Sequence, residues 1–264
     1  MNSMNNPDLP DYVFGDLQLE WLMTRWEKYA LNSLLEWIKP TISLEIGTYR
    51  GGSLQVISRH SNRVISVDLL DEPKQKLSRM FSNVDFRVGD STSLVPRLIE
   101  ELQGQDDPLN FVLIDGDHST EGVRRDIESV LKYRPKAPMF IVMHDSFNPP
   151  CREGMLQANW ASSPYVHYVE LDFVPGVYFR EGFGTVRPGS MYGGFGLAKF
   201  EPNPRSGELV VGQGHLGLYE ATYRDSPLYQ TADESGKRSN ERITWGQIKR
   251  CLRPRTRLRK LFGR

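Results

Sequence analysis

Two short stretches of the sequence place a carboxylate after an apolar run, with the spacing of a nucleotide pocket. The first stretch is Leu44-Glu45-Ile46-Gly47-Thr48-Tyr49-Arg50-Gly51-Gly52-Ser53, and the second is Val64-Ile65-Ser66-Val67-Asp68. In a parallel βαβ unit, glycines let the backbone approach a ligand closely, and an acid ending the next strand accepts hydrogen bonds from ribose hydroxyls. The pattern therefore predicts a pocket with Glu45 and Asp68 in its wall.

The glycine turn also indicates which ligand this pocket takes. Three residues separate Gly47 from Gly51, so the dinucleotide pattern G-x-G-x-x-G is absent. A pyrophosphate needs bare backbone amides at a helix N-terminus, and the charge of Glu45 would repel it. The same charge suits the ammonium group of an amino acid. S-adenosylmethionine therefore fits these demands.

Acidic and histidine side chains follow two further apolar runs, Ile114-Asp115-Gly116-Asp117-His118 and Val142-Met143-His144-Asp145-Ser146. In a parallel sheet both groups emerge at the edge that holds Glu45 and Asp68, and a divalent cation would organise them. We expect Asp115 and Asp145 to bind Mg²⁺, whereas a third ligand from His144 would favour Mn²⁺ or another transition metal. A supporting or packing role for His144 stays open.

His118 is the candidate general base of this cluster. An imidazole with an ordinary pKa near 6.5 can remove a proton at neutral pH, and a metal beside it can hold a substrate hydroxyl and lower its pKa. The alternative is that His118 only caps or hydrogen-bonds the start of a helix. Asp117 is expected to be a turn or capping acid and not a ligand.

These side chains need a sheet whose strands end at one edge. Apolar runs predict strands at residues 41–46, 64–68, 84–88, 111–114 and 139–143, with helical patterns between them. A helix is also expected over residues 17–38, ending before Pro40. The alternation predicts an α/β fold, namely a doubly wound, mostly parallel sheet with helices on both faces.

The second half of the chain is less regular. After Pro150 it is rich in Gly, Pro and Tyr, and later strands are expected at residues 165–173 and 195–200, separated by a loop over 175–194. We expect this half to shape the substrate side of the site. The predicted organisation is a leader and helix over residues 1–40, a cofactor-binding domain over 41–200 and an extension over 201–264.

Charge divides the chain unevenly. Residues 249–264 carry eight basic side chains and no acid, so the remaining residues hold eight more acidic than basic side chains. This tail could lie on an anionic membrane surface, although a solvated tail or one docked on the acidic body is as plausible. No apolar run approaches a membrane span of about 18 residues. We therefore expect a cytoplasmic protein, with free thiols at Cys151 and Cys251.

With these residues assembled, the chain resembles the class I S-adenosylmethionine-dependent methyltransferases, in particular the group of bacterial sugar O-methyltransferases and cephalosporin-hydroxylase-like proteins. The resemblance covers about residues 41–147. Asp68 matches the acid that binds ribose, and Gly89-Asp90-Ser91 looks like the turn beside adenine. The first motif implies a loop around the methionine part of the cofactor, with contacts from Glu45, Gly47, Thr48, Tyr49, Gly51 and Ser53.

The resemblance also extends to the acid and histidine cluster. Asp115 and His118 match a D-x-x-H element, which implies a metal ligand that also lies beside the cofactor, followed by a base. At His144-Asp145 the chain departs from its metal-dependent relatives, which usually carry two acids, or an acid and an amide. The family fold implies seven strands, the last of them antiparallel.

The sequence thus favours a metal-assisted O-methyltransferase that acts on a hydroxyl of a sugar, saccharide, glycolipid or other glycosylated metabolite. A metallohydrolase could use the same Asp and His residues, but it leaves the first motif unexplained. A NAD-dependent oxidoreductase and a non-catalytic binding module are further alternatives. Nucleic acid is not expected as a partner because no aromatic platform accompanies the basic tail. Self-association into a homo-oligomer is left open.

Overall fold

The computed structural model of the chain describes residues 17–181 and 188–223. The chain divides into two compact units, one comprising Met1–Val177 with Tyr192–Leu216 and the other comprising Tyr178–Met191 with Gly217–Arg264. The main sheet and the candidate site belong to the first unit. The domain boundaries expected at residues 40 and 200 stay predictions.

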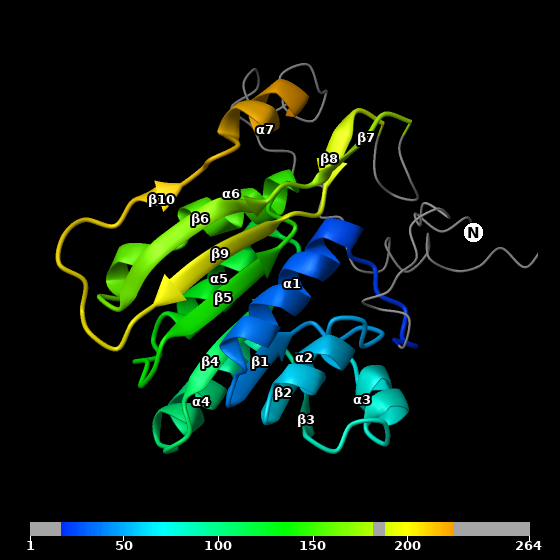
Figure 1. The fold of residues 1–264 in the computed structure, drawn as a ribbon, viewed down its shortest axis with the longest axis vertical. Helices are drawn as coiled ribbons and strands as arrows, with labels where there is room; N and C mark the ends of the chain where they lie inside the picture. The colour runs from blue at the N-terminus through cyan, green and yellow to red at the C-terminus, as the bar shows by residue number, and fades with distance from the viewer. Residues whose placement is uncertain (1–16, 182–187, 224–264) are drawn as a thin grey trace, which may run out of the picture. The chain divides into compact units, whose positions relative to one another are not determined.

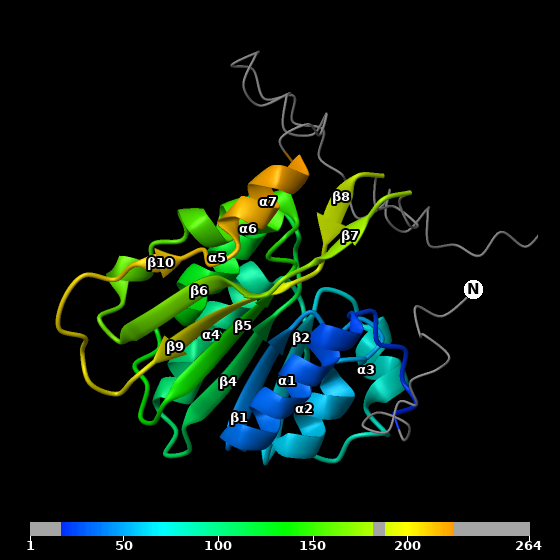
Figure 2. The ribbon, with the colours of Figure 1, turned by 45° about the horizontal axis from the view of Figure 1, so that its top comes forward.

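The sheet of the first unit has eight strands in the order β10-β6-β9-β5-β4-β1-β2-β3 (Figures 1 and 2). The strands are β1 Ile42–Ile46, β2 Arg63–Asp68, β3 Val84–Val88, β4 Leu109–Ile114, β5 Met139–His144, β6 Val166–Val174, β9 Phe195–Phe200 and β10 Val211–Gly212. Neighbours pair in parallel except β9, which is antiparallel to β5 and β6. The predicted α/β fold is confirmed, with the two-residue edge strand β10 as an unforeseen eighth strand.

Helices cover both faces of this sheet (Figure 2). The helices are α1 Arg25–Ile38, α2 Leu54–His60, α3 Glu72–Leu77, α4 Ser91–Gln103, α5 Thr120–Val130 and α6 Pro149–Gln157. One apolar core joins the strands to α4, α5 and α6, and a second core joins them to α1, α2 and α3. Burial on both faces explains why the strands are continuous apolar runs in the sequence.

Alternation along β1 decides where its acid points. Ile42, Leu44 and Ile46 belong to the core under α4 to α6. Because successive side chains of a strand point to opposite faces, Glu45 lies on the other face, towards α2. It is paired in register with Ser66 of β2, which lies on that same face. The strand pattern therefore places a carboxylate and a hydroxyl together inside the sheet.

The helix predicted over residues 17–38 is wrong in its first part. Residues 17–24 are not helical, and α1 begins at Arg25 after Thr24. The Thr24 hydroxyl accepts from the Glu27 amide at 3.3 Å, while the Glu27 carboxylate accepts from the Thr24 amide at 2.5 Å. This capping box supplies partners to the free amides at the helix start. The predicted end before Pro40 is confirmed.

The loop predicted over residues 175–194 also needs correction. It contains β7 Val177–Phe179 and β8 Ser190–Tyr192, which pair as a separate two-stranded sheet. The last described helix is α7 Leu216–Tyr223. Among the residues that the structure describes, no helix is both long enough and apolar enough to cross a bilayer. The predicted leader and the basic tail lie outside the described residues.

Candidate functional site

The glycine turn after β1 wraps around Asp68, as the sequence predicts. One oxygen of Asp68, Oδ2, accepts hydrogen bonds from the amides of Thr48 at 3.1 Å and Tyr49 at 2.9 Å. Gly47 has a φ of +99°, and a Cβ there would lie 2.1 Å from the carbonyl oxygen of Asp115. Glycine is therefore required where the ends of β1 and β4 meet, and the turn brings the two groups of predicted site residues together.

Glu45 lies inside this wall and not at its surface. Its side chain is fully buried, and it accepts hydrogen bonds from the hydroxyls of Ser53 at 2.6 Å and Ser66 at 2.7 Å. Burial raises the pKa of Glu45 to about 8, although the two serine hydrogen bonds oppose that rise. Ser53 lines the neighbouring hollow and Glu45 does not, and the contact of Glu45 with a ligand stays a prediction.

The turn after β3 holds its acid differently. Asp90 caps α4, and its Oδ1 accepts from the amide of Thr92 at 2.8 Å. Asp126 of α5 is a buried carboxyl group whose pKa burial raises to about 6. The adenine contacts expected of Asp90 and Ser91 stay predictions. The turn does lie at the same strand edge as Asp68, because β2 and β3 are parallel neighbours.

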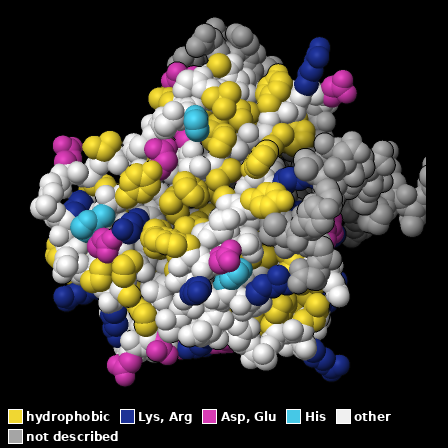
Figure 3. All heavy atoms as spheres, in the orientation of Figure 1, with side chains coloured by type: hydrophobic (Ala, Val, Ile, Leu, Met, Phe, Trp, Pro, Cys, Tyr) yellow, Lys and Arg dark blue, Asp and Glu magenta, His cyan; other side chains and the backbone are white. Residues whose placement is uncertain are grey.

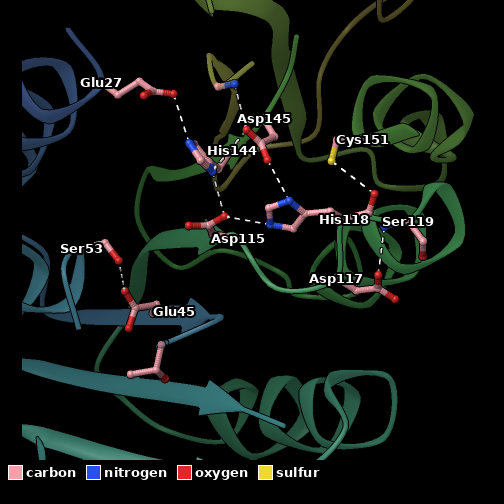
Figure 4. A network of polar contacts seen from close by, with 12 residues as sticks. Glu27, Glu45, Ser53, Asp115, Asp117, His118, Ser119, His144, Asp145 and Cys151 are labelled. Carbon is pink, nitrogen blue, oxygen red and sulfur yellow. Dashed lines mark hydrogen bonds and ion pairs between the residues drawn. The ribbon is translucent and has the colours of Figure 1, made fainter. Parts of the chain in front are cut away.

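The second group of predicted residues forms one charged cluster at the ends of β4 and β5 (Figure 4). Nδ1 of His144 lies 2.8 Å from Oδ1 of Asp115, and Nδ1 of His118 lies 2.8 Å from Oδ2 of Asp145. Nε2 of His118 lies 3.4 Å from Oδ1 of Asp115. Each histidine thus contacts a carboxylate through Nδ1, and Asp115 contacts both imidazoles.

Glu27 completes this cluster, and sequence reasoning missed it. Its Oε1 lies 3.1 Å from Nε2 of His144 and accepts from the amide of Gly194 at 2.6 Å (Figure 4). The pattern Thr24-x-x-Glu27 could have placed it at the start of a helix, but its contact with His144 spans 117 residues of sequence. Asp145 is likewise held from a distant segment, since its Oδ1 accepts from the amide of Gly193 at 3.0 Å.

Opposite charges set the protonation of this cluster. Burial alone would raise the pKa of Asp115 and Asp145, but the adjacent imidazoles hold the pKa of Asp115 well below its ordinary value and lower that of Asp145. Burial would lower the pKa of His118, yet Asp145 and Asp115 raise it to about 10. The same opposition raises the pKa of His144 well above its usual value. The cluster therefore holds protons on its histidines and negative charge on its carboxylates.

The predicted metal ligands are brought together only in part. Nδ1 of His144 lies 2.8 Å from Oδ1 of Asp115 and 3.8 Å from Oδ1 of Asp145. A different set, His118, Asp145 and Cys151, has three ligand atoms within 4.8 Å of one another in the described part of the chain. Asp117 is turned away, and its Oδ1 accepts from the amide of Ser119, the cap of α5. Of the two roles expected for Asp117, turn or cap, the geometry agrees with the turn, because the cap of α5 is Ser119.

Two hollows are found in this unit, and one of them is lined by cluster residues. The smaller, of about 70 Å³, is lined by Asp115 and His144, by residues 47–50, 52 and 53 of the glycine turn, and by residues 20–23. The larger, of about 570 Å³, lies between α1 and the end of β6 and is lined by Trp26, Tyr29, Ala30, Ser33, Phe173, Val174 and Pro175. Hydrophobic side chains gather on the face of the molecule where α1 lies (Figure 3).

Comparison with known protein families identifies this part of the chain. Residues 44–146 match the family described as "Methyltransferase domain". The match spans the strands from β1 to β5 and ends just after His144 and Asp145. The chain therefore carries a methyltransferase domain on a Rossmann-like fold, and the candidate site lies at the carboxyl edge of that domain's parallel strands. No curated protein matches the chain.

Solved structures with a similar fold include methyltransferases of different kinds. An O-methyltransferase from Bacillus cereus in complex with SAH is 17% identical, with 68% of this chain and 82% of that chain covered and a TM-score of 0.47. The O-methyltransferase TomG from Streptomyces achromogenes is 16% identical, with coverages of 66% and 79% and the same TM-score. The N-methyltransferase NodS from Bradyrhizobium japonicum is 14% identical, with coverages of 68% and 96% and a TM-score of 0.43.

Proposed function

We propose that this chain is an S-adenosylmethionine-dependent O-methyltransferase. The observation that carries the proposal is the position of His118. This imidazole is held at Nδ1 by Asp145, beside Asp115, and at the edge of a methyltransferase domain. A histidine oriented by a carboxylate next to a ligand pocket is the arrangement that proton removal from a hydroxyl requires.

The cofactor half of the proposal rests on the wall formed by the glycine turn. Ser53 and Thr48 line the small hollow, and behind Ser53 lies the carboxyl group of Glu45. The proposal assigns the methionine part of the cofactor to this wall and the ribose to Asp68. Asp68 already accepts from the amides of Thr48 and Tyr49 through Oδ2 and from the amide of Leu70 through Oδ1 at 2.8 Å. Each carboxylate oxygen can accept more than one hydrogen bond, so the acceptor capacity left on Oδ1 would serve a ribose hydroxyl.

The bound cofactor would supply an activated methyl group on a sulfonium. The neutral form of His118, which keeps its proton on Nδ1 towards Asp145, would take the acceptor's hydroxyl proton at Nε2, which is 3.4 Å from Asp115, longer than an ordinary hydrogen bond. The cofactor would supply the methyl carbon for the new bond to the acceptor oxygen and would retain the carbon–sulfur electron pair on its sulfur. The positive charge of the sulfonium and the negative charge of the deprotonated hydroxyl would be lost together. The site would therefore depend more on positioning the two reactants than on an oxyanion hole.

Metal assistance belongs to the proposal as its second part. A divalent cation fits the oxygen and nitrogen atoms of Asp115, Asp145 and His144, provided that Nδ1 of His144 gives up its proton. Such a cation would supply Lewis acidity that lowers the pKa of an acceptor hydroxyl. Loss of turnover in EDTA, restored by Mg²⁺ or Mn²⁺, is the expected result. Full activity in EDTA would contradict the metal part of the proposal, and catalysis would then depend on the histidine and carboxylate side chains without a cation.

A sugar or glycosylated metabolite is the acceptor class that we propose. The larger hollow supports it because its volume of about 570 Å³ is within the range of about 300–1,000 Å³ typical of small-molecule sites. Trp26, Tyr29 and Phe173 give it aromatic walls, and amphipathic rings suit a partner with both apolar and polar faces. Assays with hydroxyl acceptors with and without a sugar ring would test the class.

The proposed setting is the cytoplasm, with the basic tail in contact with the inner membrane surface, no nucleic acid partner, and self-association left open. The tail supports this proposal only through its charge, eight basic side chains over residues 249–264. Vesicle binding by the full chain and by a chain lacking those residues tests it. Equal binding of both to anionic vesicles would contradict it.

Calorimetric titration separates the candidate functions. We expect S-adenosylhomocysteine to bind the protein, NAD to give no heat, and Asp68→Ala to weaken S-adenosylhomocysteine at least tenfold. Binding of NAD would favour an oxidoreductase. Binding of metal without S-adenosylhomocysteine, together with ester or phosphoester hydrolysis, would favour the metallohydrolase. Binding of no small molecule would leave a non-catalytic interaction module.

A further inference from the structure

Residues 17–24, which the sequence predicts as helix, form a non-helical strap that lies against the glycine turn. We propose that Leu19–Met23 form the outer wall of the cofactor pocket, that Gln55 holds this wall in place, and that it opens to admit the cofactor. The inference rests on the proposed function, because it needs a cofactor at the glycine turn. It adds a positioning residue, Gln55, and a moving wall.

Gln55 fastens the strap to the start of α2 by two hydrogen bonds. Its Oε1 accepts from the amide of Leu19 at 3.1 Å, and its Nε2 donates to the carbonyl oxygen of Leu19 at 3.0 Å. The same Nε2 donates to the carbonyl oxygen of Gly52 at 3.0 Å. One buried amide therefore ties the strap backbone to the turn that carries the first motif.

Two further contacts hold the strap on the same turn. Glu20 forms an ion pair with Arg50, and the guanidinium of Arg50 lies 5.1 Å from the ring centre of Tyr49. Trp21 and Met23 are buried in the core that also contains α1 and α2. The strap is thus fixed by its alternate apolar side chains, while Leu22 between them is 63% exposed.

Gly52 shows how closely the strap approaches the turn. A Cβ at Gly52 would lie 2.6 Å from the carbonyl oxygen of Glu20 and 2.6 Å from the Cα of Trp21. Both are backbone atoms, so they cannot yield by a change of rotamer. Any side chain at position 52 would push the strap away from the turn.

With the strap closed, the space at the first motif is narrow. The hollow that Glu20–Met23 share with Thr48, Ser53, Asp115 and His144 holds about 70 Å³. Small-molecule sites hold about 300–1,000 Å³. Outward movement of the strap would widen this space for the methionine part of the cofactor, and closure afterwards would place strap residues against the bound ligand.

The sharpest test is Gly52→Ala, with Gly104→Ala as the matched control. The nearest atom to a Cβ at Gly104 is the carbonyl oxygen of Glu101 at 3.6 Å, an ordinary contact. Amide hydrogen exchange of residues 17–24 should quicken about tenfold or more in Gly52→Ala and stay unchanged in Gly104→Ala. S-adenosylhomocysteine should also dissociate faster from Gly52→Ala, because its outer wall is displaced.

Gln55→Glu tests the latch without changing its size. A carboxylate still accepts from the Leu19 amide, but it cannot donate to the carbonyl oxygens of Leu19 and Gly52. We expect dissociation of S-adenosylhomocysteine to quicken about tenfold, with kcat reduced less than KM is raised. The control is Gln103→Glu, because Gln103 makes the same pair of contacts with the backbone of Arg134, at 2.8 and 3.4 Å.

Each outcome separates the strap from the proposed function. If S-adenosylhomocysteine binds the unaltered protein and slows amide exchange in residues 17–24, the wall is supported. If it binds and leaves that exchange unchanged, the strap is no part of the pocket and the inference is overturned. If S-adenosylhomocysteine does not bind at all, the proposed function itself fails.

Discussion

Glu45 and Asp115 are acids near the ends of adjacent parallel strands, yet they are held in opposite ways. Glu45 accepts hydrogen bonds from two serine hydroxyls, and burial raises its pKa to about 8. Asp115 lies against two imidazoles, which outweigh burial and lower its pKa. Hydroxyls supply hydrogen bonds without charge, whereas imidazoles supply a countercharge. A strand-end acid is therefore neutral or ionised according to its partners and not its position.

This difference divides the site into two halves with different chemistry. On the Glu45 side, the polar groups are hydroxyls and backbone amides, which can hydrogen-bond a ligand. The one buried acid, Glu45, can balance the positive charge of a bound cation when it is ionised. On the Asp115 side, three carboxylates lie in contact with two histidines, an arrangement that suits proton transfer. Replacing each acid by its amide tests this division, since the substitution removes charge while keeping shape.

Asp115→Asn should give the largest effect. An amide cannot balance two imidazolium groups, so the protons and ring orientations of His118 and His144 should both change. We expect kcat to fall about 10³-fold or more and S-adenosylhomocysteine affinity to change only a few fold. Asp117→Asn is the control, because Asp117 is exposed and bonds only the turn amide of Ser119. Equal kcat values for Asp115→Asn and the unaltered enzyme would end the proposed role of Asp115.

His118→Asn should give the next largest effect, a fall in kcat of about 10²–10³-fold. In the cation-free enzyme, the two carboxylates raise the pKa of His118 to about 10, so its base form accumulates only as the pH rises through that value. Activity should therefore increase towards alkaline pH in the unaltered enzyme, and this limb should be missing in His118→Asn. His167→Asn is the control, since His167 is exposed on β6 and bonds only the carbonyl oxygen of Asn203. If activity still increases towards alkaline pH in His118→Asn, another group is the general base.

The sequence foretells much of this arrangement because strands leave local signals. Apolar runs that end in Asp68, Asp115 and Asp145 predict the strands and the edge where those acids meet. Glu27 could not be foreseen as part of the cluster, because the docking of α1 on the sheet is set by tertiary packing. The role of Ser66 required the register between β1 and β2, which no local pattern contains.

The apolar content of residues 17–24 predicts helix, yet the spacing of their apolar side chains argues against one. The apolar residues fall at Leu17, Leu19, Trp21 and Met23, a spacing of two that is typical of extended chain. The helical spacing begins only after the capping box at Thr24. The apolar residues before Thr24 therefore follow a spacing of two, and those after it follow the spacing of a helix.

Glu45→Gln should give the smallest effect and the clearest contrast with Asp115→Asn. Because the pKa of Glu45 is raised from 4.5 to about 8 on folding, the native state binds the extra proton between these values. Its contribution to stability is complete below pH 4.5 and is lost as the pH rises towards 8. Glutamine has no such dependence. The difference in unfolding free energy should therefore shift in favour of Glu45→Gln by roughly 1–3 kcal/mol between pH 5 and 8.

Denaturant unfolding of both proteins at several pH values measures this shift, and calorimetry in buffers of different ionisation enthalpy adds a second readout. If the ammonium group of the ligand draws negative charge onto Glu45, S-adenosylhomocysteine binding near pH 7 should release a proton in the unaltered enzyme and none in Glu45→Gln. Affinity should then fall only a few fold in the variant, because Ser53 still separates the side chain from the ligand. If the unfolding free energies of the unaltered enzyme and Glu45→Gln change with pH in parallel, and both release the same number of protons on binding, then Glu45 is ionised over the whole pH range. In that case Glu45 and Asp115 would not differ in protonation.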